Sequence, residues 1–335
     1  IQDINLDGKR VTLSSYGQGL QRHLIYTLIM LSAKYEDKKV GKKKDDFSPY
    51  FTLILFEEPE AFLHPTQQEY LNLSLQQLAN VADGDQQVLI TSHSPVFVCR
   101  NTTDLTSLII VHKEEALSTI FQLTSPDLDD LFDSNLSMFR LFSDMLSDDK
   151  VDKKIKETIK RIGLGEEEAD EIMKLEQESF KYFLWLDSER ASSFFANHIL
   201  ICEGASEKVF LDYLFNNKWT NLTNSNIYVL DAMGKFNIHR YMNLFAKLGI
   251  SHSVLIDGDK DKDIQAIVNN FIKENFNEFT RKLYSFEYDL EHFLGIKKPE
   301  KRKDLKPLNI MYNYHNNFIE QTKTEELRLV IESLL

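Results

Sequence analysis

Cysteine is scarce in this sequence, and it has no long apolar run. The 335 residues include two cysteines, Cys99 and Cys202, each in or beside an apolar stretch. Two isolated thiols of this kind indicate reduced core residues rather than a disulfide framework. No apolar stretch is long enough to span a bilayer, and no signal peptide is visible. These features favour a cytoplasmic protein without a membrane segment.

Glycine is also rare, and none of the 12 glycines belongs to a phosphate loop. The cradle for the β- and γ-phosphates in many ATPases requires G-x-x-x-x-G-K followed by Ser or Thr. Gly41-Lys42 lacks the earlier glycine and the following hydroxyl residue. The sequence starts with Ile1, which suggests a fragment. We therefore expect any nucleotide site here to be incomplete, and this chain to bind ATP poorly by itself.

Acidic residues outnumber basic ones, 52 to 39, giving a net charge of −13. That balance opposes nucleic-acid binding, because phosphate contacts need Lys and Arg. Net charge is a weak guide, however, when acids gather at metal sites and bases gather elsewhere. One basic cluster, at 38–44, is equally well explained as a solvated loop. The other, at 297–306, is the stronger candidate for contacts with nucleic acid.

Three regions differ in hydrophobic pattern. Residues 1–122 contain the strand-like runs FTLILF, QQVLIT and SLIIVH with helical patterns between them. Residues 123–195 have apolar residues at three- and four-residue spacing, which is typical of amphipathic helices. From residue 196 strand-like runs return as HILICE, NIYVLDA and SVLIDGD. The pattern predicts two α/β domains, at 1–122 and 196–335, joined by a helical linker region, with a mostly parallel sheet in the second.

An acidic strand end lies in FTLILFEEPEAFLHP, where Glu57 and Glu58 follow the apolar run. One acid there can hold a metal-bound water at a nucleotide, and the next can polarise the attacking water. A charged turn after a strand is the simpler alternative. Two further stretches favour a nucleotide site. SSYGQGLQR places glycines around Gln18 ahead of a helical pattern, where backbone N–H groups can contact phosphate. ITSHSP places His93 at another strand end.

The order of these three stretches resembles that of ABC-type ATPases, and EEPEAFLHP resembles their RecF, SMC and OLD branch. The resemblance implies that the chain holds the C-terminal part of such a domain, without its Walker A lobe. ATP would bind when that lobe is present. Glu57 would take the metal-associated position, Glu58 would be the catalytic acid, and His93 would contact the γ-phosphate. Ser15, Gly17 and Gln18 would belong to the signature segment.

Four acids follow strand-like runs in the last region. Glu203 and Glu207 lie in ILICEGASEKVF, and Asp257 and Asp259 lie in SVLIDGDKDKD. If these strands are parallel neighbours, their carboxyl ends share one edge of the sheet. Clustered carboxylates repel one another unless a cation lies among them. An oxygen-only set suits Mg²⁺ or Mn²⁺ rather than zinc. The alternative for the glutamate pair is an ordinary helix start, where acids are common.

The pattern E-G-x-x-E followed by D-x-D resembles the Toprim domain. That resemblance implies two divalent ions, with Glu203 as a ligand or general base, and a further acid and a lysine that complete the site. FEYDLEHFLG offers Glu287, Asp289 and Glu291, of which Glu291 is the first choice. The basic run KKPEKRKDLKPLN offers Lys306 as the catalytic lysine, with Lys303 second. Such a lysine can stabilise charge on the scissile phosphate.

An ABC-type ATPase followed by helices and Toprim resembles the OLD (overcoming lysogenization defect) nucleases. FKYFLWLDSERASSFFANHILICEGASE most resembles the nuclease subunit of the Gabija antiviral system. The resemblance implies a metal-dependent endonuclease for double-stranded DNA that is regulated by nucleotide and acts in antiphage defence. It also implies a homo-oligomer formed through the ATPase and helical regions, and a UvrD-like helicase partner. The alternative is a nucleotide-sensing or repair-type scaffold without cleavage activity, which the acid set disfavours.

Overall fold

The computed structural model describes most of the chain from residue 51 onward and short segments before it. The described residues are 2–4, 10–12, 17–19, 21, 24–28, 51–79, 86–98, 105–114, 116–165, 171–223, 226–260, 262–299 and 302–335. Contacts divide the chain into two units, Ile1–Cys99 and Arg100–Leu335. The domain boundaries predicted from the sequence, after residues 122 and 195, stay predictions, because packing units and domain families need not coincide.

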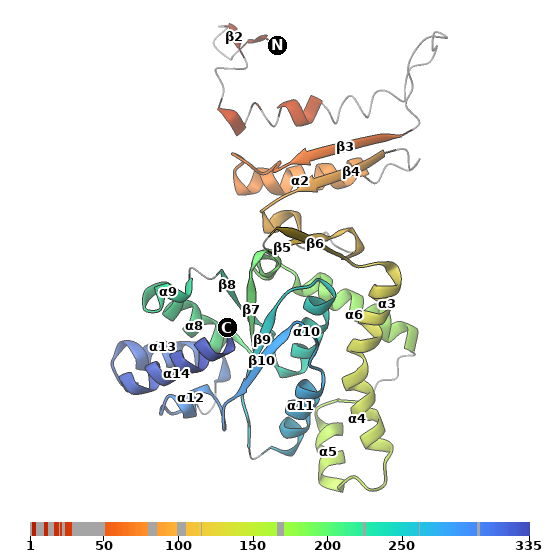
Figure 1. The fold of residues 1–335 in the computed structure, drawn as a ribbon. Coiled ribbons are helices and arrows are strands. Elements are labelled where there is room, and N and C mark those ends of the chain that lie inside the picture. The colour runs from red at the N-terminus through yellow and green to blue at the C-terminus, as the bar shows by residue number, and fades with distance from the viewer. Residues whose placement is uncertain are drawn as a thin grey trace. The chain divides into compact units, whose positions relative to one another are not determined.

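The first unit is built around two parallel strands that a helix connects (Figure 1). β3 (Thr52–Glu57) pairs with β4 (Gln86–Thr91), and α2 (Pro65–Ala79) is the crossover that a parallel pair requires. Ile54 and Phe56 alternate along β3 and share a core with Leu71 and Leu75 of α2. The unit also contains β1 (Gln2–Ile4), which pairs antiparallel with β2 (Arg10–Thr12), helical residues at 24–28, and the 3₁₀ turn η2 (Pro95–Phe97).

The second unit begins with a hairpin and a set of helices. The hairpin is formed by β5 (Ile109–Glu114) and β6 (Leu117–Gln122), after the turn η3 (Leu105–Ser107). The helices are α3 (Ser125–Asn135), α4 (Ser137–Ser147), α5 (Lys153–Arg161), α6 (Glu171–Trp185) and α7 (Ser188–Ala191), followed by the turn η4 (Ser192–Phe195). Thr124 and Asp127 form a capping box that begins α3. The helical region predicted from the three- and four-residue spacing is therefore confirmed.

The rest of the second unit is a four-stranded parallel sheet with helices on both faces (Figure 1). The strands run in the order β10 (Thr280–Ser285), β9 (His252–Ile256), β7 (His198–Cys202) and β8 (Ile227–Asp231). The helices and turns are α8 (Ala205–Asn217), α9 (Thr220–Thr223), η5 (Lys235–Asn237), α10 (Ile238–Lys247), α11 (Asp263–Glu274), α12 (Leu290–Phe293), η6 (Lys303–Leu305), α13 (Lys306–His315) and α14 (Gln321–Leu334). The predicted parallel sheet is confirmed. Among the described residues, no helix combines the length and the apolar character that crossing a membrane requires.

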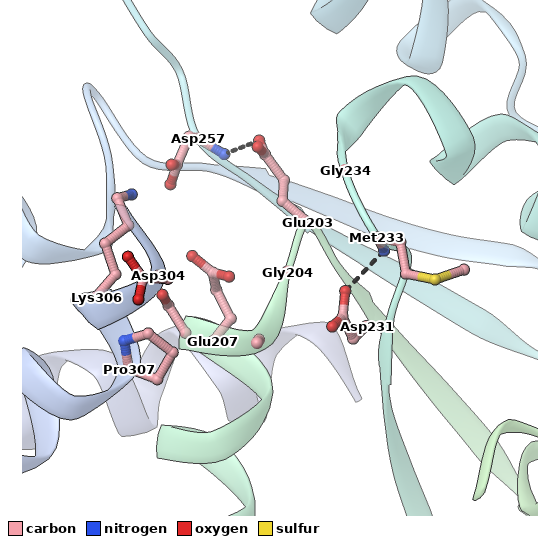
Figure 2. A pocket seen from close by; sticks show the side chains of 12 residues that line it. Glu203, Gly204, Glu207, Asp231, Met233, Gly234, Asp257, Asp304, Lys306 and Pro307 are labelled. Carbon is pink, nitrogen blue, oxygen red and sulfur yellow. Dashed lines mark hydrogen bonds between the residues drawn. The ribbon is translucent and has the colours of Figure 1, made fainter. Parts of the chain in front are cut away.

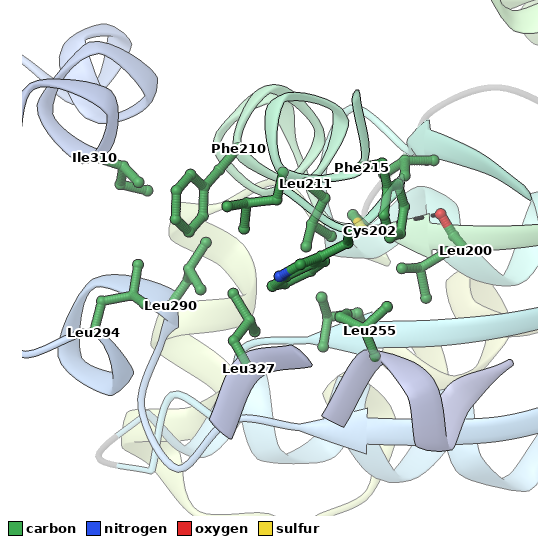
Figure 3. Close-up of a cluster of buried hydrophobic side chains, with 14 of the residues drawn as sticks. Leu200, Cys202, Phe210, Leu211, Phe215, Leu255, Leu290, Leu294, Ile310 and Leu327 are labelled. Carbon is green, nitrogen blue, oxygen red and sulfur yellow. Dashed lines mark hydrogen bonds between the residues drawn. The ribbon is translucent and has the colours of Figure 1, made fainter. Parts of the chain in front are cut away.

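The central strands are apolar throughout because both faces of the sheet are covered. Every residue of β9 is buried, as are the last four residues of β7. Figure 3 shows the core on one face, where side chains of β7, β9, α8, α12 and α14 meet. Cys202 lies in this core, and burial raises the pKa of its thiol well above the usual value, so it is a packing residue. The core fixes the strand ends that carry the acids.

A buried polar network joins the helical region to the sheet domain. Glu178 of α6 accepts hydrogen bonds from Arg240 of α10, 2.7 Å from Nε and 2.8 Å from Nη2. The same guanidinium donates from Nη1 to the Phe236 carbonyl at 2.9 Å. The Tyr182 hydroxyl donates to the Arg240 carbonyl and accepts from Asn135 of α3. Three helices and the segment after β8 are thereby held in one arrangement.

Candidate metal centre and nucleotide-binding segment

The register of the central strands places Glu203 and Asp257 side by side. β7 and β9 pair in parallel with Cys202 opposite Leu255, so the residues that follow each strand lie at one edge of the sheet. The backbone N–H of Asp257 donates to Glu203 Oε1 at 2.7 Å. Glu203 is therefore fixed by the neighbouring strand end.

A cavity of about 360 Å³ opens at this edge (Figure 2). Glu203, Glu207, Asp257 and Lys306 line it, together with Asp231. In Figure 2 the Glu207, Asp257 and Lys306 side chains extend toward a common space between α8 and the start of α13. Residues from three strand ends and two helices thus meet at one hollow. Asp231 turns inward on its own loop, because its Oδ1 accepts from the Met233 N–H at 2.7 Å.

Glu207 lies in the first turn of α8 and is buried. Burial raises the pKa of its carboxyl to about 7, and the negative charges of Glu203 and Glu291 act in the same direction. Glu203 also has a raised pKa, because burial outweighs the opposing effects of Lys235 and the Asp257 N–H. Both groups therefore lie where a negative charge is costly without a cation.

Asp257 has the strongest such signal. Its side chain is 9% exposed, and Oδ1 has no hydrogen-bond partner among the residues that the structure describes. Burial raises the pKa of this carboxyl to about 8, assisted by the charges of Glu203 and Glu207. A buried carboxylate oxygen without a donor is an expensive arrangement unless a ligand satisfies it. Asp257 is thus the acid in this part of the chain that most calls for a cation.

Asp259 has different neighbours from Asp257. Its carboxylate accepts from Lys235 at 3.0 Å and from Lys262 at 2.6 Å. Burial acts to raise its pKa, but the two lysines outweigh this and lower it. Between the two aspartates, a Cβ on Gly258 would lie 2.1 Å from the Phe286 carbonyl oxygen. Glycine is needed there because the segment that follows β10 passes so close.

Of the three later acids, Glu291 is the most deeply buried. It lies in α12 and is 0% exposed, and the ammonium of Lys306 lies 3.3 Å from its Oε1. Asp289 caps α12 by accepting from the His292 N–H at 2.8 Å, and it also pairs with Lys298. Glu287 is exposed and pairs with Lys260 at 2.6 Å. The structure thus gives the three acids distinct surroundings, with Glu291 nearest to Lys306.

Lys306 begins α13 and lies against the acids. Its Nζ is 3.3 Å from Glu291 Oε1. Burial acts to lower the pKa of its ammonium, but the charges of Glu291 and Asp257 outweigh this and raise it. Lys306 therefore carries its positive charge at the cavity wall. The second lysine candidate, Lys303, begins the turn η6.

Lys235 belongs to the centre, although the sequence patterns did not single it out. It begins η5 and is 3% exposed. Its Nζ lies 3.1 Å from Glu203 Oε1, 3.0 Å from Asp259 Oδ2 and 2.7 Å from the Asp257 carbonyl oxygen. The sequence signal was a Gly-Lys pair directly after the end of β8. The position of Lys235 beside Glu203 can be predicted from that signal only when the strand order is known.

The donor set fits a hard divalent ion. The acids supply only oxygen atoms, and Asp257 Oδ1 has no donor among the described residues. In the described part of the chain, no three His, Cys, Asp or Glu side chains converge at ligand spacing. Two of the acids, Glu203 and Asp259, are paired with Lys235. The predicted five-ligand set of Glu203, Glu207, Asp257, Asp259 and Glu291 stays a prediction.

In the first unit, the predicted nucleotide residues gather at the ends of β3 and β4. Glu57 ends β3 opposite Thr91, and the Glu58 N–H donates to the Thr91 carbonyl at 2.8 Å. Glu58 adopts a left-handed backbone conformation with φ of 42°. Its Oε1 lies 3.5 Å from His93 Nε2, and both side chains are exposed. The expected catalytic acid and the expected histidine are therefore adjacent.

Glu60 is a further residue of this arrangement that sequence analysis did not identify. One carboxylate oxygen accepts from the Ser92 hydroxyl and from the His93 N–H, both at 2.8 Å. It fixes the loop after β4 across 33 residues of sequence. Of the signature residues, Gly17 and Gln18 are exposed at the start of a helical segment. Ser15 lies outside the described residues.

Comparisons with known proteins agree with this two-part organisation. A family model for an AAA ATPase domain matches residues 1–98. A family model described as overcoming lysogenization defect protein-like, TOPRIM domain, matches residues 194–259. The chain thus combines an AAA ATPase segment with a Toprim domain of the OLD-like type, and the fold predicted from the sequence is confirmed.

One curated relative carries the similarity further. The chain is 26% identical to the Old nuclease of Escherichia phage P2 over 143 residues. The match covers 39% of this chain and 23% of that protein, so the chain spans about a quarter of its relative. The similarity supports an OLD-family assignment, whereas no comparison bears on the narrower Gabija resemblance.

Proposed function

We propose that this chain forms part of a metal-dependent DNA endonuclease of the OLD type. The observation that carries the proposal is Asp257, a buried carboxylate whose Oδ1 has no donor among the described residues, at a cavity that Glu203, Glu207 and Lys306 also line. A buried carboxylate oxygen without a hydrogen-bond donor destabilises the fold, so packing alone does not explain its presence. A site for a divalent cation and a phosphodiester gives this acid a function.

Two roles are proposed for the residues of the centre: the acids hold the metal ion, and the lysine stabilises charge on the phosphate. Asp257, Glu207 and Glu291 would bind Mg²⁺ or Mn²⁺, which activates a water and stabilises the leaving oxygen in phosphodiester cleavage. Glu203 is held in place by the Asp257 N–H and serves as a ligand or general base. Lys306 carries its charge at the cavity wall, where it can stabilise the charge that develops on the scissile phosphate.

The basic segment 297–306 supports a polyanionic substrate. It contains six lysines and arginines, connects α12 to α13, and ends at the cavity in Lys306. Lys297 and Lys298 are exposed beside the centre. Contacts from such side chains to the DNA backbone would position the duplex without reading its sequence. The net charge of −13 does not oppose this, because the charges are segregated.

The ATPase segment would regulate cleavage. Glu58, Glu60 and His93 form a contiguous set at the strand ends. We propose that this set acts at a nucleotide bound between protomers in a homo-oligomer, once the phosphate-loop lobe is supplied. The Gabija resemblance extends the proposal to antiphage defence alongside a UvrD-like helicase.

Metal-dependent cleavage of plasmid and linear DNA tests the proposal. The full-length protein is incubated with Mg²⁺ or Mn²⁺, and compared with Asp257→Asn and with Glu325→Gln, which changes an exposed acid on α14. We expect cleavage by the wild type and the Glu325 variant, and loss in the Asp257 variant. Equal cleavage by all three would end the nuclease assignment. Nucleotide binding without any cleavage would instead favour the scaffold function.

A further inference from the structure

The acids of the Toprim centre fall into two sets with different partners. Glu203 and Asp259 share the ammonium of Lys235, at 3.1 and 3.0 Å. The other set consists of Glu207, Asp257 and Glu291, which face the Lys306 side. In that set Glu291 pairs with Lys306 at 3.3 Å, whereas Asp257 Oδ1 has no hydrogen-bond partner among the described residues. The two sets therefore differ in that one ammonium joins both acids of the first set, whereas Asp257 of the second lacks a donor at Oδ1.

Lys235 is saturated and enclosed. An ammonium has three N–H donors, and this one has three oxygen neighbours, the third being the Asp257 carbonyl at 2.7 Å. Its side chain is 3% exposed, so water cannot replace these partners. A divalent ion between Glu203 and Asp259 would have to displace the lysine and leave a buried charge without partners. Such a displacement is strongly unfavourable.

The backbone supports this fixed position. Gly234 precedes Lys235 with a positive φ of 111°, and its N–H donates to the Glu203 carbonyl at 2.7 Å. Lys235 is then the first residue of η5, which continues directly into α10. The loop thus ties the lysine to the strand that ends in Glu203. Its ammonium is built into the centre and is not a side chain that folds over it.

We propose that Lys235 permanently fills one of the two cation positions, so that the centre binds a single divalent ion, toward which Glu207, Asp257 and Glu291 would have to draw closer together than they lie in this structure. The inference rests on the proposed function and makes it narrower. It replaces the two-ion expectation with one metal ion and one resident ammonium. Lys235 acts as a positioning residue, because it orients Glu203 and Asp259 and touches no reacting atom.

Counting bound Mn²⁺ tests the inference without any cleavage assay. The full-length protein, free of nucleotide, is titrated with Mn²⁺ by calorimetry and by electron paramagnetic resonance. Binding to the Asp257→Asn variant is subtracted as the surface background. We expect one ion per wild-type chain, and two in Lys235→Met, whose neutral side chain frees Glu203 and Asp259. The pair would give a spin-coupled spectrum, because ions that share a carboxylate lie about 4 Å apart. Lys235→Arg keeps the charge and should stay at one.

Each contrary result has a distinct meaning. Two ions in the wild type overturn the inference and leave the nuclease proposal standing. So does a folded Lys235→Met variant that still binds one ion. If that variant does not fold, Mn²⁺ binding by Glu203→Gln tests the inference instead. Retention of the single ion with less than a threefold change in affinity supports the inference that Lys235 holds Glu203. Loss of the ion would show that Glu203 is a ligand and would overturn it. A wild type that binds no ion overturns the proposed function itself.

Discussion

Arg240 of α10 holds Glu178 of α6 in a buried, two-point ion pair, with distances of 2.7 and 2.8 Å. Glu178 is 1% exposed and has no access to replacement water. We expect Glu178→Gln to lower the free energy of unfolding by about 3 kcal/mol, because the guanidinium then stays buried without its counter-charge. Urea unfolding measures this. Glu176→Gln, an exposed change on the same helix, should have little effect.

The same ion pair gives a pH dependence. Burial acts to raise the pKa of Glu178, but Arg240 and Lys181 outweigh it, so the folded pKa lies below the ordinary 4.5. A carboxyl whose pKa is lowered by folding stabilises the protein above its unfolded pKa. That contribution is lost as the pH falls through the folded value. The stability difference between wild type and Glu178→Gln should therefore shrink below pH 4.5. A difference that stays constant would show that charge plays no part in it.

Removing an acid from the metal centre should stabilise the metal-free protein. Asp257 lies beside Glu203 and Glu207, and its Oδ1 has no donor among the described residues. In EDTA, the free energy of unfolding of Asp257→Asn should exceed that of the wild type by about 1 kcal/mol, since functional acids are retained at the expense of stability. Added Mn²⁺ should reverse the order by stabilising only the wild type. Thermal unfolding follows both states. An asparagine variant that is less stable in EDTA would contradict the expectation.

The two candidate lysines can be separated by rate. Lys306 lies 3.3 Å from Glu291 and lines the cavity, so Lys306→Met should reduce cleavage by about 10²-fold or more. The Mn²⁺ count should be unchanged. Lys303→Met should retain most of the rate, and any loss should depend on salt, as for a phosphate contact. Single-turnover cleavage at saturating DNA distinguishes them. Equal losses would leave the assignment of Lys306 without support.

Gly258 permits a direct test of close packing. An alanine Cβ would lie 2.1 Å from the Phe286 carbonyl oxygen and 2.5 Å from that of Glu287. Gly258→Ala should force the segment that follows β10 away and cost about 2 kcal/mol of stability, in the range of overpacked cores. Gly204→Ala is the matched control, since its Cβ would meet only Glu207 Oε2 at 3.9 Å. Urea unfolding of both variants should differ accordingly. Equal stability would show that the segment at Phe286 can move away without a measurable loss of stability.

The chain by itself should bind ATP weakly. Its sequence has no G-x-x-x-x-G-K-[S/T] loop to cradle the phosphates, whatever Glu58 and His93 contribute. Isothermal calorimetry with Mg²⁺ and ATP should show no saturation below about millimolar nucleotide, since the cradle supplies most phosphate contacts. A tight, saturable isotherm would contradict this. Glu58→Gln should not alter the result, because the role proposed for that residue is on the attacking water and not in binding nucleotide.

The parallel sheet of the second unit was predictable from the sequence because its central strands, β7 and β9, are buried on both faces and are followed directly by acids. Apolar runs such as HILIC and HSVLI are long enough to mark the strands. The positions of Glu203 and Asp257 then follow from parallel pairing. These inferences use only local pattern and one topological rule.

The partners of the acids could not be predicted in the same way. Lys235 is an ordinary Gly-Lys turn in sequence, and it enters the centre because β8 lies next to β7. Glu60 reaches the loop after β4 across 33 residues. Asp257 and Asp259 are separated by one glycine, yet only Asp259 pairs with Lys235 and Lys262. Such contacts arise from the packing of segments that are distant in sequence, and they produce no periodic sequence pattern from which they could be predicted.

The hydrogen bond from Arg240 to the Phe236 carbonyl has a consequence for control of the centre. Phe236 directly follows Lys235, so one guanidinium connects α6 of the helical region to the lysine that orients Glu203 and Asp259. A shift of α6 would either break a buried ion pair or move that lysine. The helical region is therefore physically connected to the candidate metal centre through Arg240. Its displacement is a route by which an event outside the Toprim domain would change the geometry of the acids.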